Sequence, residues 1–308
     1  MTEKPLVSVI INCYNGEKYL REAIDSVMAQ TYENWELVFW DNQSTDSTRE
    51  IVESYKNPKI KYYFAPNHTP LGEARNLAMR EAKGQYISFL DADDLWLSVF
   101  LETGLKILAS NNEIIGYYCN YFDLFPKQET IHSSFVISPI RKAADIVSYY
   151  NIGMSGVILK ANIIRNNNLF FNEDYNLIED LDFYFRVTVV GPLYYDAKPL
   201  IKYRCHFGST TYRRAKEWAG EYDLFLSKLR REYMEQGVIE EKDLWRIKLS
   251  AFGAHMERFI QENDKWNFLK LFFGNIKYLK YYWRNFLFII VGKNVFLKIR
   301  NKKKFIVP

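Results

Sequence analysis

The sequence has few cysteines, no long apolar run and no segment rich in glycine or proline. Its three cysteines, Cys13, Cys119 and Cys205, lie far apart without a CxxC spacing, which argues against a zinc site and a disulfide framework. The first residues, MTEKPLVSVI, lack the pattern of a signal peptide, so we expect a protein that acts on the cytosolic side. The longest apolar run, residues 286–291, is too short to cross a bilayer.

Acidic residues are absent from the last part of the sequence. No Asp or Glu follows Asp264, whereas eleven of the 41 Lys and Arg residues do, which leaves 30 basic and 37 acidic residues before that point. In this tail, residues 265–308, aromatic and basic residues alternate. The combination favours an anionic lipid surface over nucleic acid, for which the sequence holds no motif. The alternative is that the tail packs as ordinary helices or mediates dimerisation.

Strand-like and helix-like patterns alternate through the first 110 residues. Apolar, β-branched or aromatic segments that suit strands lie at 6–12, 35–41, 59–65 and 85–91. Each precedes a segment with helical apolar spacing, at 16–30, 44–55, 72–83 and 98–108. Four strand-then-helix units predict an α/β fold with a parallel, doubly wound sheet.

The pattern changes after residue 113. Further strand-like segments occur at 113–122, 153–160, 192–196 and 199–204, with a strong helical pattern at 179–190. We interpret these as a mixed extension of the same sheet. Beyond Thr211 the apolar spacing is helical, so we expect a first domain of residues 1–212 and a helical region of residues 213–308.

Polar side chains gather where the predicted parallel strands end. NCYNGE follows the first strand, DNQSTD the second and DADD the fourth. Ligands of open parallel sheets bind outside the carboxyl ends of the strands, so we predict a site there. Carboxylates as closely spaced as Asp91, Asp93 and Asp94 repel one another and suit Mg²⁺ or Mn²⁺. The alternative is that Asp93 or Asp94 caps the next helix and Asp91 forms an Asx turn.

Three segments in this order are similar to a known family: VSVIINCYNGEKYLREAIDSVMAQTYENWELVFWDNQSTDST, LGEARNLAMREAKGQYISFLDADD and LIEDLDFYFRV. The set resembles the family 2 glycosyltransferases, inverting enzymes of the GT-A fold that use nucleotide sugars, over about residues 6–212. The resemblance implies a Rossmann-like, mostly parallel sheet flanked by helices, with residues 213–308 as a C-terminal helical extension.

The resemblance also implies the reaction. A hexosyl or N-acetylhexosaminyl group would move from a nucleotide-diphosphate sugar, first of all a UDP-sugar, by a single displacement that depends on Mn²⁺ or Mg²⁺. The acceptor would be a glycan or lipid-linked glycan in polysaccharide biosynthesis. With its basic, aromatic tail, the protein is then expected as a peripheral enzyme on the cytoplasmic face of the membrane.

The resemblance assigns the nucleoside contacts to the first two strand ends. Tyr14 matches an aromatic residue beside the nucleobase, where a ring face allows stacking; the alternative is a Tyr that fills the core. Asn12 and Asn15 would fix the loop. Asp41 matches the first acidic residue of the family's DDxS pattern, but Asn42 stands at the second position, where a carboxylate usually accepts from the uracil N–H. An amide both donates and accepts, so uridine remains compatible.

The remaining donor contacts come from two later segments. Arg75 matches an Arg near the nucleotide and diphosphate; the alternative is a surface Arg that pairs with Glu81 or Asp41. Asp93 matches the metal-binding residue of the DxD motif, and Asp91 is expected near the ribose or near a water molecule around the metal.

Three roles remain for the acidic residues and the late histidine. Asp94 is expected to cap the following helix. In IEDLDF, Asp180 matches the catalytic base, whereas Asp182 complements the helix dipole. His206, in YRCHFGSTT, matches a residue that contacts the metal or phosphate; the alternative is a structural histidine.

Two other function classes are compatible with such a sheet. A nucleotidyltransferase acting on sugar phosphates would need a Gly-rich, basic loop after the first strand, and NCYNGEKYL is a poor version of one. A membrane-bound interaction protein could keep the GT-A fold without activity, but the complete acidic motifs argue against it.

Overall fold

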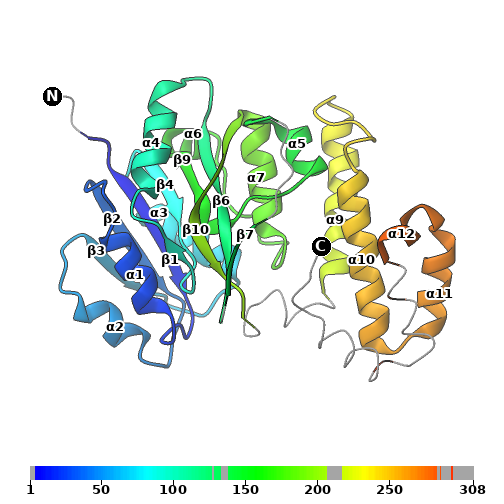
Figure 1. Ribbon diagram of the computed structural model, residues 1–308, viewed down its shortest axis with the longest axis horizontal. Coiled ribbons are helices and arrows are strands. Elements are labelled where there is room, and N and C mark those ends of the chain that lie inside the picture. Colours follow the sequence, from blue (N-terminus) through cyan, green and yellow to red (C-terminus); the bar gives the residue numbers. More distant parts are fainter. Residues whose placement is uncertain are drawn as a thin grey trace. The chain divides into compact units, whose positions relative to one another are not determined.

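The computed structural model describes residues 4–126, 128–132, 138–206 and 217–282, together with residues 285 and 293. The chain divides into two compact units, Met1–Phe207 and Gly208–Pro308 (Figure 1). The segment 207–216, with part of YRCHFGSTT, and the apolar run 286–291 lie outside the described residues.

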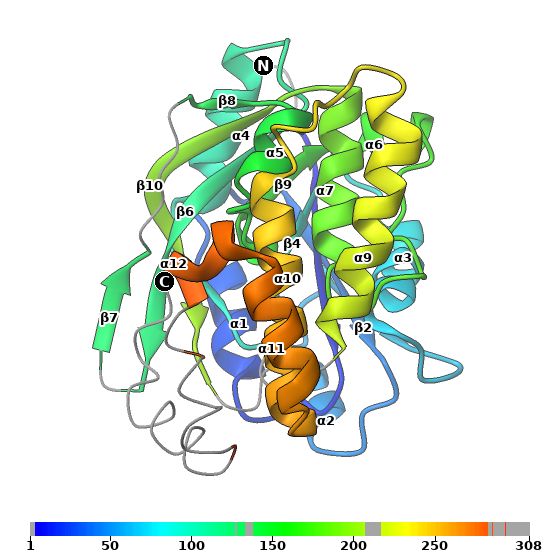
Figure 2. The same cartoon turned by 90° about the vertical axis from the view of Figure 1, so that its right-hand side faces the viewer.

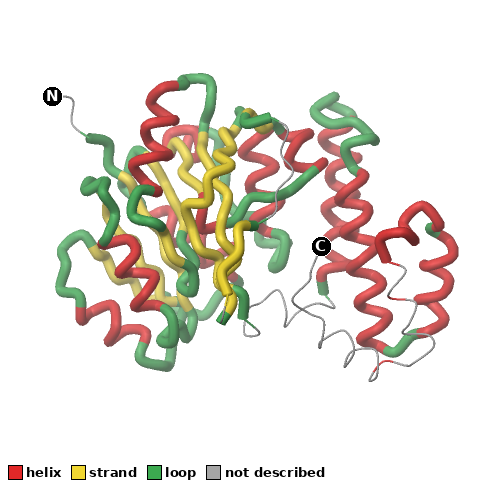
Figure 3. The backbone as a smooth tube through the Cα atoms, viewed as in Figure 1, coloured by secondary structure: helices red, strands yellow, loops and turns green. Residues whose placement is uncertain are grey.

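As far as its residues are described, the first unit is built on a ten-stranded sheet, drawn in yellow in Figure 3. Its main path runs in the order β3-β2-β1-β4-β9-β6-β10-β5, with β7 paired to β6 and β8 to β10. The strands are β1 Val7–Cys13, β2 Trp35–Asp41, β3 Ile60–Phe64, β4 Tyr86–Phe89, β5 Leu95–Trp96, β6 Gly116–Phe125, β7 Gln128–Ile131, β8 Ile140–Arg141, β9 Val157–Lys160 and β10 Leu193–Arg204. The strands β3, β2, β1 and β4 are parallel and β9 is antiparallel to both neighbours, which confirms the predicted fold class.

Strand register sets the position of the predicted site. Cys13 at the end of β1 pairs with Asp41 at the end of β2, and Ile10 pairs with Phe89 at the end of β4. Hydrogen bonds continue past the strands, from the Asn42 N–H to the Cys13 carbonyl and from the Leu90 N–H to the Ile10 carbonyl. The segments that follow β1, β2 and β4 therefore leave the sheet at one edge.

Helices cover both faces of this sheet, as Figure 2 shows from the side. The helices α1 Leu20–Met28, α2 Thr48–Ser54 and α4 Phe100–Ser110 share one apolar core with the inward side chains of β1 and β2. The opposite face carries α3 Leu71–Glu81, α6 Ala161–Asn166 and α7 Glu179–Val190, and α5 Ala143–Ser148 packs on α7. On that side Phe171 stacks on Phe183 at 4.2 Å and contacts Phe89 of β4 edge-on. Burial on both faces explains the mostly apolar sequence of β1.

Two predicted strands form one. The segments 192–196 and 199–204 are both part of β10, whose pairing with β6 shifts between Asp196, Pro199 and Ile201. Proline cannot donate to a neighbouring strand, so the irregularity falls where Pro199 stands. The predicted strand 153–160 begins with a 3₁₀ turn, Met154–Gly156, before β9.

A short strand follows the acidic cluster. Leu95 and Trp96 form β5, which pairs antiparallel with β10 through Lys202 and Ile201. This pairing brings the end of β10 next to Asp93 and Asp94, and it delays the following helix, so that α4 begins at Phe100.

The second unit is helical. It contains α9 Trp218–Lys228, a π-helical segment Leu229–Met234, α10 Trp245–Glu262, α11 Lys265–Gly274, a 3₁₀ turn Ile276–Tyr278 and α12 Leu279–Tyr282. Asn263 ends α10 in the left-handed conformation, and Asp264 caps α11 by accepting from the Asn267 N–H at 3.0 Å.

The described part of the tail packs as ordinary helices on one side and stays exposed on the other. Phe268 and Phe272 of α11 are buried in a cluster with Met256 and Ile260 of α10. Trp266 and Phe273 remain exposed. Among the described residues, no helix has the length and apolar character needed to span a membrane.

Candidate active site

The acidic cluster lies in the loop between β4 and β5. The pairing of β5 with β10 folds this loop against Ser155 and Arg204. The Asp91 N–H donates to Ser155 Oγ at 3.1 Å, and Arg204 Nε donates to the Asp93 carbonyl at 2.8 Å. The three carboxylates thus stand at the sheet edge where the predicted parallel strands end.

Asp94 is a structural anchor. It is buried and accepts from Ser155 Oγ at 2.6 Å and from the Arg204 N–H at 2.9 Å. Burial, reinforced by the charges of Asp93 and Asp91, raises its pKa well above the usual value. The expectation that Asp94 or Asp93 caps the next helix is wrong, because β5 intervenes and the N-cap of α4 is Val99.

Asp93 faces His206. Its Oδ2 lies 2.7 Å from His206 Nε2, and its side chain keeps 35% of its surface exposed. Arg204, two residues earlier, is held by a contact of 4.3 Å with the Tyr19 ring and by Glu22 at 2.9 Å. The two residues predicted as metal ligands, Asp93 and His206, therefore meet at one point.

Arg75 joins the two acidic motifs. Its Nη1 donates to Glu179 at 2.8 Å and its Nη2 to Asp91 at 3.2 Å. The Arg75 side chain is 6% exposed and that of Glu179 is 7%, so this is a buried ion pair. The alternative of a surface Arg paired with Glu81 or Asp41 is wrong. The single guanidinium holds the DADD loop against the start of α7, although 104 residues separate Arg75 from Glu179.

Asp180 is held by two donors. The Tyr150 hydroxyl donates to Oδ2 at 2.8 Å, and the Leu181 N–H donates to Oδ1 at 2.7 Å. Burial raises the pKa of Asp180, while the Tyr150 hydrogen bond and the Arg75 charge lower it. A carboxylate with a raised pKa and a fixed orientation is suited to proton transfer. Asp182, in the same helical turn, forms an ion pair with Arg186 at 2.7 Å.

The loops after β1 and β2 are joined by hydrogen bonds. Asn15, with φ of 54°, accepts from the Thr45 N–H at 2.8 Å and donates its own N–H to Ser44 Oγ at 2.9 Å. A Cβ at Gly16 would collide with Cys13, so the close approach of this loop requires glycine. Asn15 thus fixes the loop, whereas the Nδ2 of Asn12 is buried without a hydrogen-bond partner.

Tyr14 projects from this loop. It is 54% exposed, so the alternative that it fills the core is wrong. Its ring lies 4.4 Å from that of His68. Asp41 and Asn42, at the end of β2, are both buried and hold protein partners. The residues predicted around the nucleoside therefore lie together at the ends of β1 and β2. Tyr14 is exposed there, whereas Asp41 and Asn42 are buried.

The Asp93–His206 pair fits a divalent cation. Asp93 Oδ2 and His206 Nε2 lie 2.7 Å apart and share one hydrogen. Without that hydrogen, the carboxylate oxygen and the imidazole nitrogen could both bind one metal ion. No group of three or more His, Cys, Asp or Glu side chains within the described residues is arranged to hold a metal. Mg²⁺ and Mn²⁺ sites that use one or two protein ligands are completed by substrate phosphates and water.

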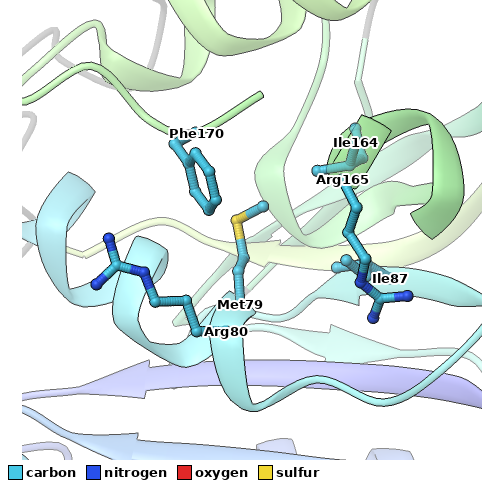
Figure 4. A pocket seen from close by; sticks show the side chains of 6 residues that line it. All are labelled: Met79, Arg80, Ile87, Ile164, Arg165 and Phe170. Carbon is cyan, nitrogen blue, oxygen red and sulfur yellow. The ribbon is translucent and has the colours of Figure 1, made fainter. Parts of the chain in front are cut away.

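A separate pocket of about 230 Å³ lies on the α3 side of the sheet and is shown in Figure 4. It is lined by Met79, Arg80, Ile87, Ile164, Arg165 and Phe170. Arg165 donates to the Ala82 and Gly84 carbonyls, which ties α6 to the turn before β4. None of the residues predicted for the site lines this pocket.

Sequence reasoning missed several residues that hold the site together. Tyr150 and Ser155 have no spacing relation to Asp180 or Asp94, and only the folded chain brings them into contact. Glu179 directly precedes Asp180 in the acidic segment, and this adjacency could have indicated that Glu179 belongs to the site. His68 belongs to no recognised pattern.

Comparisons with known proteins identify the family. Residues 8–161 match the family model described as Glycosyl transferase family 2. An uncharacterized glycosyltransferase of Rickettsia typhi is 33% identical over 244 residues, which cover 76% of this chain and 75% of that protein. The chain therefore belongs to glycosyl transferase family 2 and is a glycosyltransferase.

Two further proteins have more specific names. The UDP-Glc:α-D-GlcNAc-diphosphoundecaprenol β-1,3-glucosyltransferase WfgD of Escherichia coli is 40% identical over 116 residues, 38% of this chain and 46% of that protein. The structure of S. aureus TarS 1-349 in complex with UDP-GlcNAc superimposes with a TM-score of 0.62 at 19% identity, covering 82% of this chain and 72% of that one. The structural similarity identifies the fold as GT-A.

Proposed function

We propose that this enzyme transfers a hexosyl or N-acetylhexosaminyl group from a UDP-sugar to a glycan or lipid-linked glycan acceptor, with inversion at the anomeric carbon. The observation that carries the proposal is the bridge from Asp91 through Arg75 to Glu179, the residue before the proposed base Asp180. The name of WfgD, with UDP-Glc as donor and a diphosphoundecaprenol-linked sugar as acceptor, supports both substrate classes.

Asp180 is the proposed catalytic base. Its carboxylate takes the proton of the acceptor hydroxyl while that oxygen attacks the anomeric carbon. The bond from the anomeric carbon to the diphosphate oxygen breaks, and the nucleoside diphosphate leaves with the electron pair. Tyr150 keeps the carboxylate oriented, and Arg75 compensates the charges of Asp91 and Glu179 close by. Because one displacement occurs, the configuration inverts.

Asp93 and His206 are the proposed metal ligands, and Asp91 of the same loop is the proposed contact to the ribose. A bound Mn²⁺ or Mg²⁺ would neutralise the charge that develops on the leaving diphosphate. Tyr14 offers its exposed ring to the nucleobase, and the enclosed residues Asp41 and Asn42 shape the wall behind it.

The second unit is proposed to hold the enzyme at the cytoplasmic face of a membrane, where a lipid-linked acceptor is located. Trp266 and Phe273 lie seven residues apart on the outer side of α11, with Lys270 between them 5.2 Å from the Trp266 ring. Exposed aromatic and basic side chains on one helix face are typical of the interface with anionic lipids.

Incubation with a panel of nucleotide sugars tests this function. We expect release of UDP from a UDP-sugar, in the presence of MnCl₂ and with loss of activity in EDTA. Consumption of a nucleoside triphosphate and a sugar phosphate with release of pyrophosphate would instead identify a nucleotidyltransferase. Donor binding without turnover of any donor, with lipid-linked acceptors present, would identify an inactive GT-A protein.

A further inference from the structure

The polar residues at the end of β2 are already committed to protein partners. Asp41 is fully buried, and its oxygens accept from the Ser44 N–H and from the Tyr62 hydroxyl, both at 2.7 Å. A carboxylate held in this way stabilises the loop after β2. It has no exposed surface with which to contact a nucleobase.

Asn42 is committed to Thr69. Its Nδ2 donates to the Thr69 carbonyl at 2.8 Å, and its Oδ1 accepts from the Thr69 N–H at 3.1 Å. Because a backbone carbonyl only accepts and a backbone N–H only donates, these two bonds fix the orientation of the amide. Asn42 thus fastens the segment around residue 69 to the end of β2.

A separate contact, with the backbone carbonyl of Asn42, sets the tautomer of His68. Its Nδ1 lies 2.8 Å from the backbone carbonyl oxygen of Asn42. Since that oxygen can only accept, Nδ1 must carry the hydrogen, and in the neutral ring Nε2 is then a hydrogen-bond acceptor. His68 is exposed, and among the described residues no protein group bonds to Nε2. Its ring lies beside Tyr14 at 4.4 Å, with an angle of 58° between the planes.

We propose that His68 determines the choice of nucleobase by accepting the N3–H of uracil at Nε2, beside the ring of Tyr14. This inference rests on the proposed use of a nucleotide sugar. Uracil presents an N–H at this position, whereas cytosine N3 and adenine N1 present a lone pair that would face the lone pair of Nε2. The amide of Asn42 is bound to Thr69 and cannot accept the uracil N–H. His68, in the neighbouring loop, would provide that hydrogen-bond acceptor instead.

Calorimetric binding of UDP, CDP, GDP and ADP in the presence of MnCl₂ tests the proposal. We expect the wild-type enzyme to prefer UDP over CDP by about tenfold or more. In His68→Ala, UDP binding should weaken by about three- to tenfold, the range for one neutral hydrogen bond, while CDP binding changes little. In His68→Gln, the amide both donates and accepts, so CDP binding should improve toward that of UDP.

His132→Ala is the matched control. His132 also stacks on a tyrosine ring, that of Tyr121 at 4.2 Å, but it pairs with the carboxylate of Asp123. Its removal should leave the UDP to CDP ratio unchanged. Unaltered discrimination in both folded His68 variants would overturn the role of His68. If GDP binds as tightly as UDP, the proposed preference of the site for uracil is wrong. If the wild-type enzyme binds no nucleoside diphosphate, the proposed function fails as well.

Discussion

Replacing Arg75 by methionine should strongly destabilise the first unit. Methionine is similar in length to the apolar part of arginine but carries no charge, so Glu179 would remain buried without its cationic partner. The pKa of Asp91 would also rise, because Arg75 lowers it. The substitution therefore separates the charge of Arg75 from its bulk.

The expected magnitude follows from the two contacts. The pair with Glu179 is buried on both sides, and breaking such a pair by removing one partner costs about 3 to 5 kcal/mol. The pair with Asp91 is longer, at 3.2 Å, and the Asp91 side chain is 38% exposed, so it contributes about 1 kcal/mol or less. We expect Arg75→Met to lower the free energy of unfolding by about 3 to 5 kcal/mol.

Urea unfolding of the full-length protein measures this loss. The transition that shifts when UDP is added belongs to the unit that binds the nucleotide. Arg80→Met is the matched control, because Arg80 is an exposed residue of the same helix, near the Phe170 ring. It should change the free energy of unfolding by about 0.5 kcal/mol or less.

The double variant Arg75→Met/Glu179→Gln decides the cause. If the cost arises from a buried carboxylate that has lost the charge of Arg75, neutralising Glu179 should recover about 2 kcal/mol or more of the loss. A loss below about 1 kcal/mol in Arg75→Met would show that the bridge contributes little. A double variant no more stable than Arg75→Met would show that lost packing is responsible.

Three further outcomes are expected. Tyr150→Phe removes a hydrogen bond that lowers the pKa of Asp180, so the acid limb of the pH profile of kcat/KM should move to higher pH. Tyr118→Phe is the control: it removes a buried hydroxyl that bonds Asn151 and should leave the acid limb unchanged. Asp93→Ala should remove the effect of MnCl₂ on donor binding measured by calorimetry, and an unchanged metal titration would contradict the ligand assignment. The double substitution Trp266→Ser/Phe273→Ser should reduce binding to phosphatidylglycerol vesicles in flotation assays by about tenfold. Leu224 is an exposed residue of α9, and Leu224→Ser should leave vesicle binding unchanged.

Much of the parallel half of the sheet could be predicted from the sequence. Strand β1 is mostly apolar because both faces are covered, and β2 was predicted with the observed bounds, Trp35–Asp41. The later strands were harder to predict. With only two residues, β5 has no periodicity to detect, and its omission led to the wrong expectation that Asp94 caps a helix.

The acidic residues at the strand ends could be recognised in the sequence, but the contacts that join them could not. The cluster from Asp91 to Asp94 and the segment around Asp180 differ in composition from the apolar strand and helix beside them. Their bridge through Arg75 depends on where α3 and α7 pack, which no local pattern encodes. For the same reason the contact of Tyr150 with Asp180 could not be predicted, since 30 residues, among them β9 and α6, separate the two.

Asn42 shows how a substitution in a familiar motif can mislead. From the sequence alone, its amide was compatible with direct contact to the base. In the structure, both ends of that amide bind Thr69, and the neighbouring His68 becomes the candidate for base recognition. The deciding contacts lie 27 residues away in sequence, beyond the reach of motif comparison.

The central claim is that Asp180 is the base that completes a donor site built around Asp93. The most direct measurement compares donor affinity and transfer rate in Asp180→Asn, whose amide keeps the shape of the side chain but cannot accept the proton. We predict UDP-sugar binding within about twofold of the wild-type enzyme and a transfer rate lower by about 10²- to 10⁴-fold. Transfer at a near wild-type rate would contradict the account.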